Sequence, residues 1–141
     1  MSSSKIMIDA GADEVRAVLF DIANYPTWSK TIKATKVESS DDQGRPVRIQ
    51  LTIEAGMLRD KPTLEYDWSG APEKVSFSLV DADLLTQMDG TYIVKSAGGE
   101  TEVTYELETD VSMPVPKPML HSAELSTIKA ALDELKEKVE G

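Results

Sequence analysis

Residues 114–141 read PVPKPMLHSAELSTIKAALDELKEKVEG, and this stretch decides the expected fold. After its opening prolines it contains no further Pro or Gly until Gly141. Its apolar residues recur at alternating spacings of three and four, which predicts one apolar stripe on a long amphipathic helix. The stripe consists of Leu125, Ile128, Leu132, Leu135 and Val139, and one further turn back it reaches His121, the single histidine.

The composition is that of an ordinary soluble domain with an acidic balance. The chain has 141 residues, of which 40% are hydrophobic and 28% charged, so it can bury a sizeable core. Its formal net charge of -10 argues against nucleic-acid partners and anionic membranes, because both need clustered Lys and Arg. We expect a monomer or homodimer that binds a small hydrophobic molecule, with no nucleic acid and no stable membrane insertion.

Residue types missing from the sequence exclude several kinds of site. There is no cysteine, which excludes disulfides, thiolate metal sites and thiol nucleophiles, and one histidine excludes a His-pair metal site. We therefore expect neither a metal nor a cofactor. Residues 1–5 lack an apolar run of signal-peptide length, and no stretch approaches the roughly 20 apolar residues of a membrane span. The expected location is cytoplasmic.

The other helical signals lie near the start of the chain. Residues 5–9 predict a short strand, and residues 12–22 predict a helix with acidic residues in its first turn and one apolar face. Pro26 is well placed to begin a second short helix over residues 27–32, because its missing N–H has no partner in a first turn anyway.

Alternating apolar and polar residues then predict about six strands. Val47, Ile49 and Leu51 alternate with polar residues, the pattern of a strand with one buried face. Gly56 is expected to end that strand, and residues 58–68 to form its hairpin partner. Short connections predict an antiparallel sheet, so we expect an α+β fold in which a curved sheet wraps around the C-terminal helix. The other strands are expected over residues 34–38, 75–79, 85–95 and 103–111.

The N-terminal residues also carry a family resemblance. The runs Ile8-Asp9-Ala10, Ala12-Asp13-Glu14-Val15, Leu19-Phe20-Asp21-Ile22 and Tyr25-Pro26-Thr27-Trp28 resemble the opening of the START-like (SRPBCC) superfamily. The similarity is to the polyketide cyclase/dehydrase and lipid-transport branch, near coenzyme Q-binding relatives. It implies a single helix-grip domain over residues 1–141. It also implies a deep cavity between sheet and helix, in which relatives hold lipids, quinones, hormones or polyketide intermediates.

The candidate ligand-binding residues are mostly aromatic, and each also has a structural interpretation. His121 could hydrogen-bond a ligand carbonyl or act as an acid or base, or it could simply be exposed at the helix start. Trp28 could close the cavity or hold the short helices on the sheet. The strand residues could line a pocket or fill the core. The full set is Trp28, Tyr66, Trp68, Phe77, Met88, Tyr92, Tyr105, His121 and Leu125.

No residue is assigned a catalytic role. Glu102, Glu106, Glu108 and Asp110 alternate with apolar residues, which predicts a solvated face rather than a pocket that shifts carboxyl pKa values. We therefore expect a non-enzymatic protein that binds or transports a small hydrophobic ligand. An aromatase/cyclase-type enzyme, which would use His121 and a tyrosine, is one alternative. A ligand-free accessory module that acts through protein contacts is the other.

Overall fold

The computed structural model describes residues 1–55 and 58–141, so the turn expected at Gly56 lies outside the described residues. Two helical segments follow the first strand, and one long helix ends the chain. The elements are β1 (Ser2–Ile8), α1 (Ala12–Leu19), the 3₁₀ helix η1 (Ile22–Thr27), β2 (Ile32–Ser40), β3 (Pro46–Ala55), β4 (Leu58–Asp60), β5 (Thr63–Asp67), β6 (Lys74–Asp81), β7 (Leu85–Ala97), β8 (Glu100–Val111) and α2 (Lys117–Glu140).

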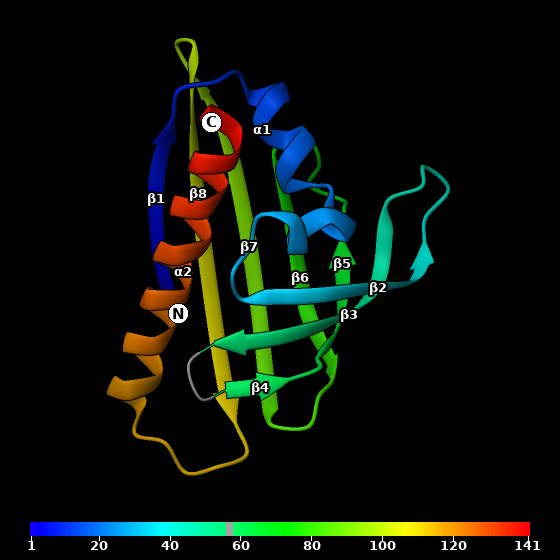
Figure 1. The fold of residues 1–141 in the computed structure, drawn as a ribbon, viewed down its shortest axis with the longest axis vertical. Helices are drawn as coiled ribbons and strands as arrows, with labels where there is room; N and C mark the ends of the chain where they lie inside the picture. Colours follow the sequence, from blue (N-terminus) through cyan, green and yellow to red (C-terminus); the bar gives the residue numbers. More distant parts are fainter. Residues whose placement is uncertain (56–57) are drawn as a thin grey trace.

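The strands form one antiparallel sheet in the order β1-β8-β7-β6-β5-β3-β2, with β4 paired to β3. β1 pairs with β8, so the first and last strands of the chain are neighbours at one end of the strand order. In Figure 1, β2 and β3 run across the direction of β7 and β8, which shows how strongly the sheet bends. The predicted α+β arrangement of a curved antiparallel sheet and a long C-terminal helix is confirmed.

The strand alternation predicted from the sequence sets the inner face of the sheet. On β3, Ile49, Leu51 and Ile53 are buried, and on β8, Val103 and Leu107 are buried while Glu106 between them is more exposed. The inner face packs against α1 and α2, because each apolar side of a sheet must be covered by another layer. No helix in the described part of the chain is long and apolar enough to cross a membrane.

Helix α2 lies along β1 and β8 (Figure 1). Ile128, Leu132 and Leu135 of the predicted stripe are buried there. Two parts of the prediction are wrong: Leu125, a member of the stripe, is 38% exposed, and His121, to which the stripe was extended, is exposed. The buried line of the helix instead continues from Ile128 to Glu124, whose carboxylate finds hydrogen-bond donors on the sheet.

Two other predicted elements differ from the structure for local reasons. The second helix spans Ile22–Thr27 rather than residues 27–32. The Ser29 hydroxyl accepts hydrogen bonds from the amides of Thr31 and Ile32, which ends the helical turn and starts β2. The strand expected over residues 58–68 is divided at Pro62, which has no N–H to contribute to a strand ladder.

Candidate functional site

A cavity of about 290 Å³ lies between α2 and the inner face of the sheet. β3, β7 and β8 supply its broad apolar wall, and the start of β2 and the segment after β8 supply its edges. A cavity walled mostly by apolar side chains, with a few polar groups, is the usual form of a small-molecule site. The main apolar contributors from the sheet are Leu51, Ile53, Leu85, Met88, Leu107 and Val111.

The cavity exists because α2 presents small side chains beside its buried stripe. Ile128 and Leu135 anchor the helix, and both are fully buried. Ala123, Thr127 and Ala131 follow each other at four-residue spacing on the neighbouring face and line the cavity. Their side chains are too short to fill the space between helix and sheet, so the helix is held in place while a hollow remains beside it.

Two tyrosines meet at the floor of the cavity. Tyr92 on β7 and Tyr105 on β8 are directly paired in the sheet, and their rings stack with centroids 4.0 Å apart and planes inclined by 15°. Burial is the main cause that raises the pKa of both phenols well above the ordinary value. Both hydroxyls are therefore neutral at physiological pH. The hydrogen bond between the two side chains raises the pKa of Tyr92 and lowers that of Tyr105, so Tyr92 is the donor and the Tyr105 hydroxyl keeps a proton for a bound molecule.

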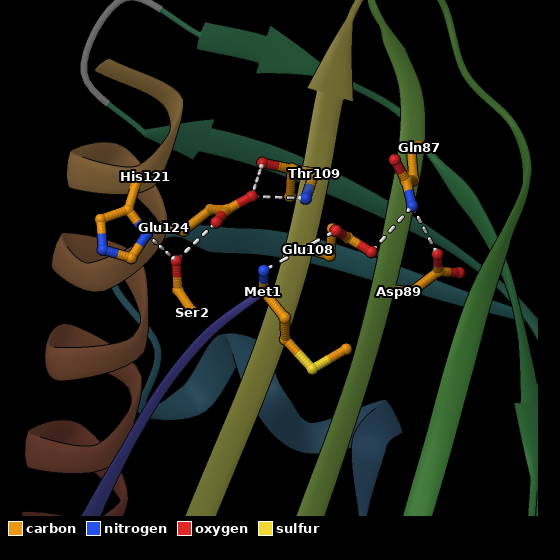
Figure 2. A network of polar contacts seen from close by, with 8 residues as sticks. All are labelled: Met1, Ser2, Gln87, Asp89, Glu108, Thr109, His121 and Glu124. Carbon is orange, nitrogen blue, oxygen red and sulfur yellow. Dashed lines mark hydrogen bonds and ion pairs between the residues drawn. The ribbon is translucent and has the colours of Figure 1, made fainter. Parts of the chain in front are cut away.

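A buried carboxylate forms the polar end of the helix wall. Glu124 Oε1 accepts a 2.6 Å hydrogen bond from the Ser2 hydroxyl, and Oε2 accepts bonds from the amide and hydroxyl of Thr109 at 2.6 and 2.9 Å (Figure 2). Burial by itself would raise the pKa of this carboxyl, but the hydrogen bonds from Ser2 and Thr109 lower it below its ordinary value. Glu124 is therefore an anion that ties α2 to β1 and β8.

His121 lies next to this network but outside the cavity. Its Nδ1 is 2.7 Å from the Ser2 hydroxyl oxygen. Since Ser2 directs its only proton to Glu124, Nδ1 must carry the proton that closes this contact. His121 lines an adjoining polar groove of about 650 Å³ together with Met1, Glu108 and Lys117.

The same groove holds a second set of polar contacts (Figure 2). The amino group of Met1 is 3.7 Å from Glu108 Oε1. Gln87 Nε2 donates to Glu108 Oε2 at 3.2 Å and to Asp89 Oδ2 at 2.9 Å. Among residues 1–55 and 58–141, no three His, Cys, Asp or Glu side chains are grouped closely enough to hold a metal ion.

The family model described as "Polyketide cyclase / dehydrase and lipid transport" matches residues 2–140. The chain belongs to this family. Its fold is the START-like helix-grip fold, as the sequence predicted. The finer expectation of nearness to coenzyme Q-binding relatives stays a prediction. A search of curated proteins gave no match.

Solved structures with the same fold share little sequence with this member of the family. A START superfamily protein from Mycobacterium smegmatis has a TM-score of 0.92 at 22% identity, over 98% of this chain and 95% of that one. A protein from Thermus thermophilus has a TM-score of 0.84 at 17% identity, over 98% and 95% of the two chains. The Zhui aromatase/cyclase from Streptomyces sp. R1128 has a TM-score of 0.76 at 14% identity, over 98% of this chain and 92% of that one. At these identities the likeness shows the fold alone.

Within this family fold, three of the candidate residues lie at the cavity and three lie in the core. Met88, Tyr92 and Tyr105 line the cavity. The other strand aromatics pack on one another: Tyr66 lies 6.1 Å from Trp68 and 5.4 Å from Phe77 between ring centroids. Trp68 also donates a 2.6 Å hydrogen bond from Nε1 to the Pro46 carbonyl, which fixes it in the core.

The remaining candidates lie outside the lining. Trp28 packs edge-on against Tyr25, with centroids 5.0 Å apart, and lines a shallow surface hollow rather than the cavity. Its neighbours Ser29 and Thr31 do line the cavity. His121 lies in the groove, and Leu125 lies on the solvent side of α2.

Sequence reasoning missed the helix residues that face the cavity. These include Thr127 and Ala131, which carry no distinguishing signal in the sequence because a small residue on a helix can face either way. Glu124 and Glu134 were missed because only the carboxylates of the predicted strands were considered. One signal was available for Glu124, since it stands four residues before Ile128 and therefore on the buried face of the helix.

Proposed function

We propose that the protein binds or transports one small hydrophobic molecule between α2 and the sheet. The observation that carries this proposal is the apolar cavity of about 290 Å³, walled by β3, β7, β8 and the small residues of α2. Burying a ligand there would remove apolar surface from water, which is worth about 25 cal/mol per Å² before ordering terms are subtracted.

The cavity also suggests the size and polarity of the ligand. An engineered cavity of about 150 Å³ binds benzene, so the larger volume found here corresponds to a molecule of about two to three rings. The neutral hydroxyls of Tyr92 and Tyr105 would orient a ligand carbonyl or hydroxyl. Met88 would supply adaptable apolar contact beside them.

The arrangement supports binding better than acid–base catalysis. The phenols of Tyr92 and Tyr105 have raised pKa values, so neither serves as a base near neutral pH. The Glu124 carboxylate is already held by Ser2 and Thr109. The aromatase/cyclase alternative relied on His121, which lines the groove instead. The ligand-free alternative requires a packed interior, which the cavity argues against.

A matched pair of tryptophan variants tests the proposal. In Ala131→Trp the new side chain enters the cavity, whereas in Leu125→Trp it lies on the exposed side of the same helix. We expect N-phenyl-1-naphthylamine, a neutral fluorescent probe, to bind the wild type and Leu125→Trp with one-to-one stoichiometry. Ala131→Trp should bind at least about tenfold more weakly, since each lost 1.4 kcal/mol is tenfold in affinity. Equal binding by all three proteins would refute the assigned cavity.

A further inference from the structure

The charged side chains that line the cavity are both acidic. Glu124 and Glu134 lie on α2, and no Lys, Arg or His is found in the lining among the described residues. Ten helical positions correspond to about 15 Å at 1.5 Å per residue, so the two carboxylates stand towards opposite ends of the helix wall. A ligand in the cavity therefore lies between two acidic groups and meets no basic side chain.

Glu124 holds a permanent negative charge at one end. Its three hydrogen bonds, from the Ser2 hydroxyl and from the amide and hydroxyl of Thr109, all require an accepting carboxylate. They lower the pKa of this carboxyl despite its burial. A carboxylate offers about four acceptor positions, so one position is left for a donor on a ligand.

Glu134 is the carboxylate at the other end of the helix wall. Its Oε2 accepts a 3.0 Å hydrogen bond from the Lys30 amide, and within residues 1–55 and 58–141 no donor is bonded to Oε1 of this cavity-lining side chain. The side chain is half-buried and stands between the cavity and the shallow hollow lined by Trp28, Lys30 and Lys138. Lys30 and Lys138 line that hollow together with Glu137, and neither lysine lines the cavity.

The cationic groups nearest to Glu124 do not cancel the negative charge of the cavity lining. These cationic groups are the Met1 amino group and Lys117, and they line the adjoining groove together with the carboxylates of Glu108 and Asp110. The Met1 amino group is 3.7 Å from Glu108, which offsets its charge. A ligand carboxylate would therefore leave water for a site without a compensating cation, which is strongly unfavourable.

We propose that the cavity selects apolar ligands that carry a hydroxyl or an amine and rejects those that carry a carboxylate, through Glu124 and Glu134. This rests on the proposed function and narrows its ligand class: hydrophobic alcohols, phenols and amines fit the site, and fatty acids and other hydrophobic acids do not. The donor group of the ligand would lie towards Glu134 Oε1, and the apolar body against Leu51, Leu107 and the tyrosine pair.

Three ligands of one shape test this selectivity: 1-naphthylmethanol, 1-naphthylmethylamine and 1-naphthoate, each competed against N-phenyl-1-naphthylamine at pH 7.5. The amine and the acid each carry one charge that loses water on binding. The difference between their affinities therefore reports whether the charge around the cavity is negative or positive. We expect the acid to bind at least about tenfold more weakly than the amine, from like-charge repulsion at several ångströms. Glu134→Gln should narrow this ratio by at least about threefold, because it removes one of the two charges.

Glu137→Gln is the matched control, because it changes the net charge equally on the same helix at an exposed residue outside the cavity lining. It should leave the acid-to-amine ratio at the wild-type value. Equal binding of acid and amine by the wild type, or an equal change of the ratio in both variants, would overturn the selectivity while leaving the cavity assignment standing. If neither the probe nor any of the three compounds binds, the proposed function itself fails, and the selectivity with it.

Discussion

Ser2 on β1 donates a 2.6 Å hydrogen bond to Glu124 on α2, joining residues 122 positions apart in the chain. Thr109 on β8 donates to the other carboxylate oxygen of Glu124. The Glu124 side chain therefore holds the N-terminal part of α2 against two neighbouring strands. Few large apolar residues of the helix are buried at this end of the cavity, so these hydrogen bonds supply the attachment.

Replacing Glu124 by alanine should destabilise the protein. The Thr109 amide and the Ser2 hydroxyl would lose their acceptor at a buried site, so we expect the free energy of unfolding to fall by about 2–3 kcal/mol. Chemical denaturation at pH 7 measures this. Glu137→Ala on the exposed side of the helix should change it by less than about 0.5 kcal/mol. If the two substitutions lowered the free energy of unfolding equally, the hydrogen bonds of Glu124 would not contribute to stability.

Asp60 should make stability depend on pH in the acid range. Burial would raise the pKa of its carboxyl, but hydrogen bonds from the amides of Leu85, Asp83, Leu84 and Lys61 lower it. The folded-state pKa thus lies below the unfolded value of about 3.9, so the stabilisation is present above about pH 3.9 and is lost as pH falls through the folded-state pKa.

The Asp60→Asn variant tests that dependence. An amide offers one accepting oxygen and places an NH₂ group against backbone donors, so we expect a loss of about 2 kcal/mol in the free energy of unfolding at pH 7. The loss should shrink as the pH falls below about 3.9, because the wild-type carboxyl protonates at more acidic pH than in the unfolded chain. Denaturation curves across that range measure it, with exposed Asp42→Asn as control. If the stability difference between the wild type and Asp60→Asn stayed constant with pH, the lowered pKa assigned to Asp60 would be wrong.

Gly90 on β7 faces Phe77 on β6, and a side chain at Gly90 would overlap the Phe77 ring. Gly90→Ala should therefore lower the free energy of unfolding by about 1–3 kcal/mol through overpacking. Combining it with Phe77→Leu should recover part of that loss. Gly11→Ala is the control, because its backbone φ is -68° and its new Cβ would have only Glu14 within reach, at 3.9 Å. Additive effects of Gly90→Ala and Phe77→Leu in thermal or chemical unfolding would argue against this contact.

Removing the hydroxyls of Tyr92 and Tyr105 should change ligand preference more than stability. The double Phe variant keeps the stacked rings but cannot donate to a ligand carbonyl. We expect affinity for 2-acetylnaphthalene to fall by about three- to tenfold, the value of one hydrogen bond, with little change for 2-ethylnaphthalene. Calorimetric titration with both compounds measures the difference. An equal loss for both ligands would indicate damaged packing rather than lost hydrogen bonds.

The sequence predicted those parts of the fold that depend on periodicity. The strand alternation around Ile49 and Val103 and the helical spacing from Ile128 to Leu135 each record which side of an element is buried. Local patterns of this kind survive in the sequence because every turn of the element repeats them. They were enough to predict a curved sheet and a covering helix.

The site was harder to predict because it depends on contacts between distant segments. Glu124 is buried only because Ser2 and Thr109 supply donors from two strands, and no local pattern shows that. Ala131 lines the cavity because its side chain is too short to fill the space between α2 and the sheet. Tyr66 was predicted to bind a ligand because it is an aromatic residue on a strand, but it packs in the core. Residue type alone does not separate a lining aromatic from a core aromatic.

The most direct test of the central claim is methyl NMR of the wild-type protein titrated with N-phenyl-1-naphthylamine, because it locates the ligand without any substitution. The predicted result is that the methyl signals of cavity residues Leu51, Ile53 and Leu107 shift and saturate at one equivalent, while those of Leu64 and Val75 in the core and Leu125 on the exposed helix face stay in place. Shifts at Leu125 or Val75 with none at Leu51, Ile53 and Leu107 would contradict a binding site between α2 and the sheet.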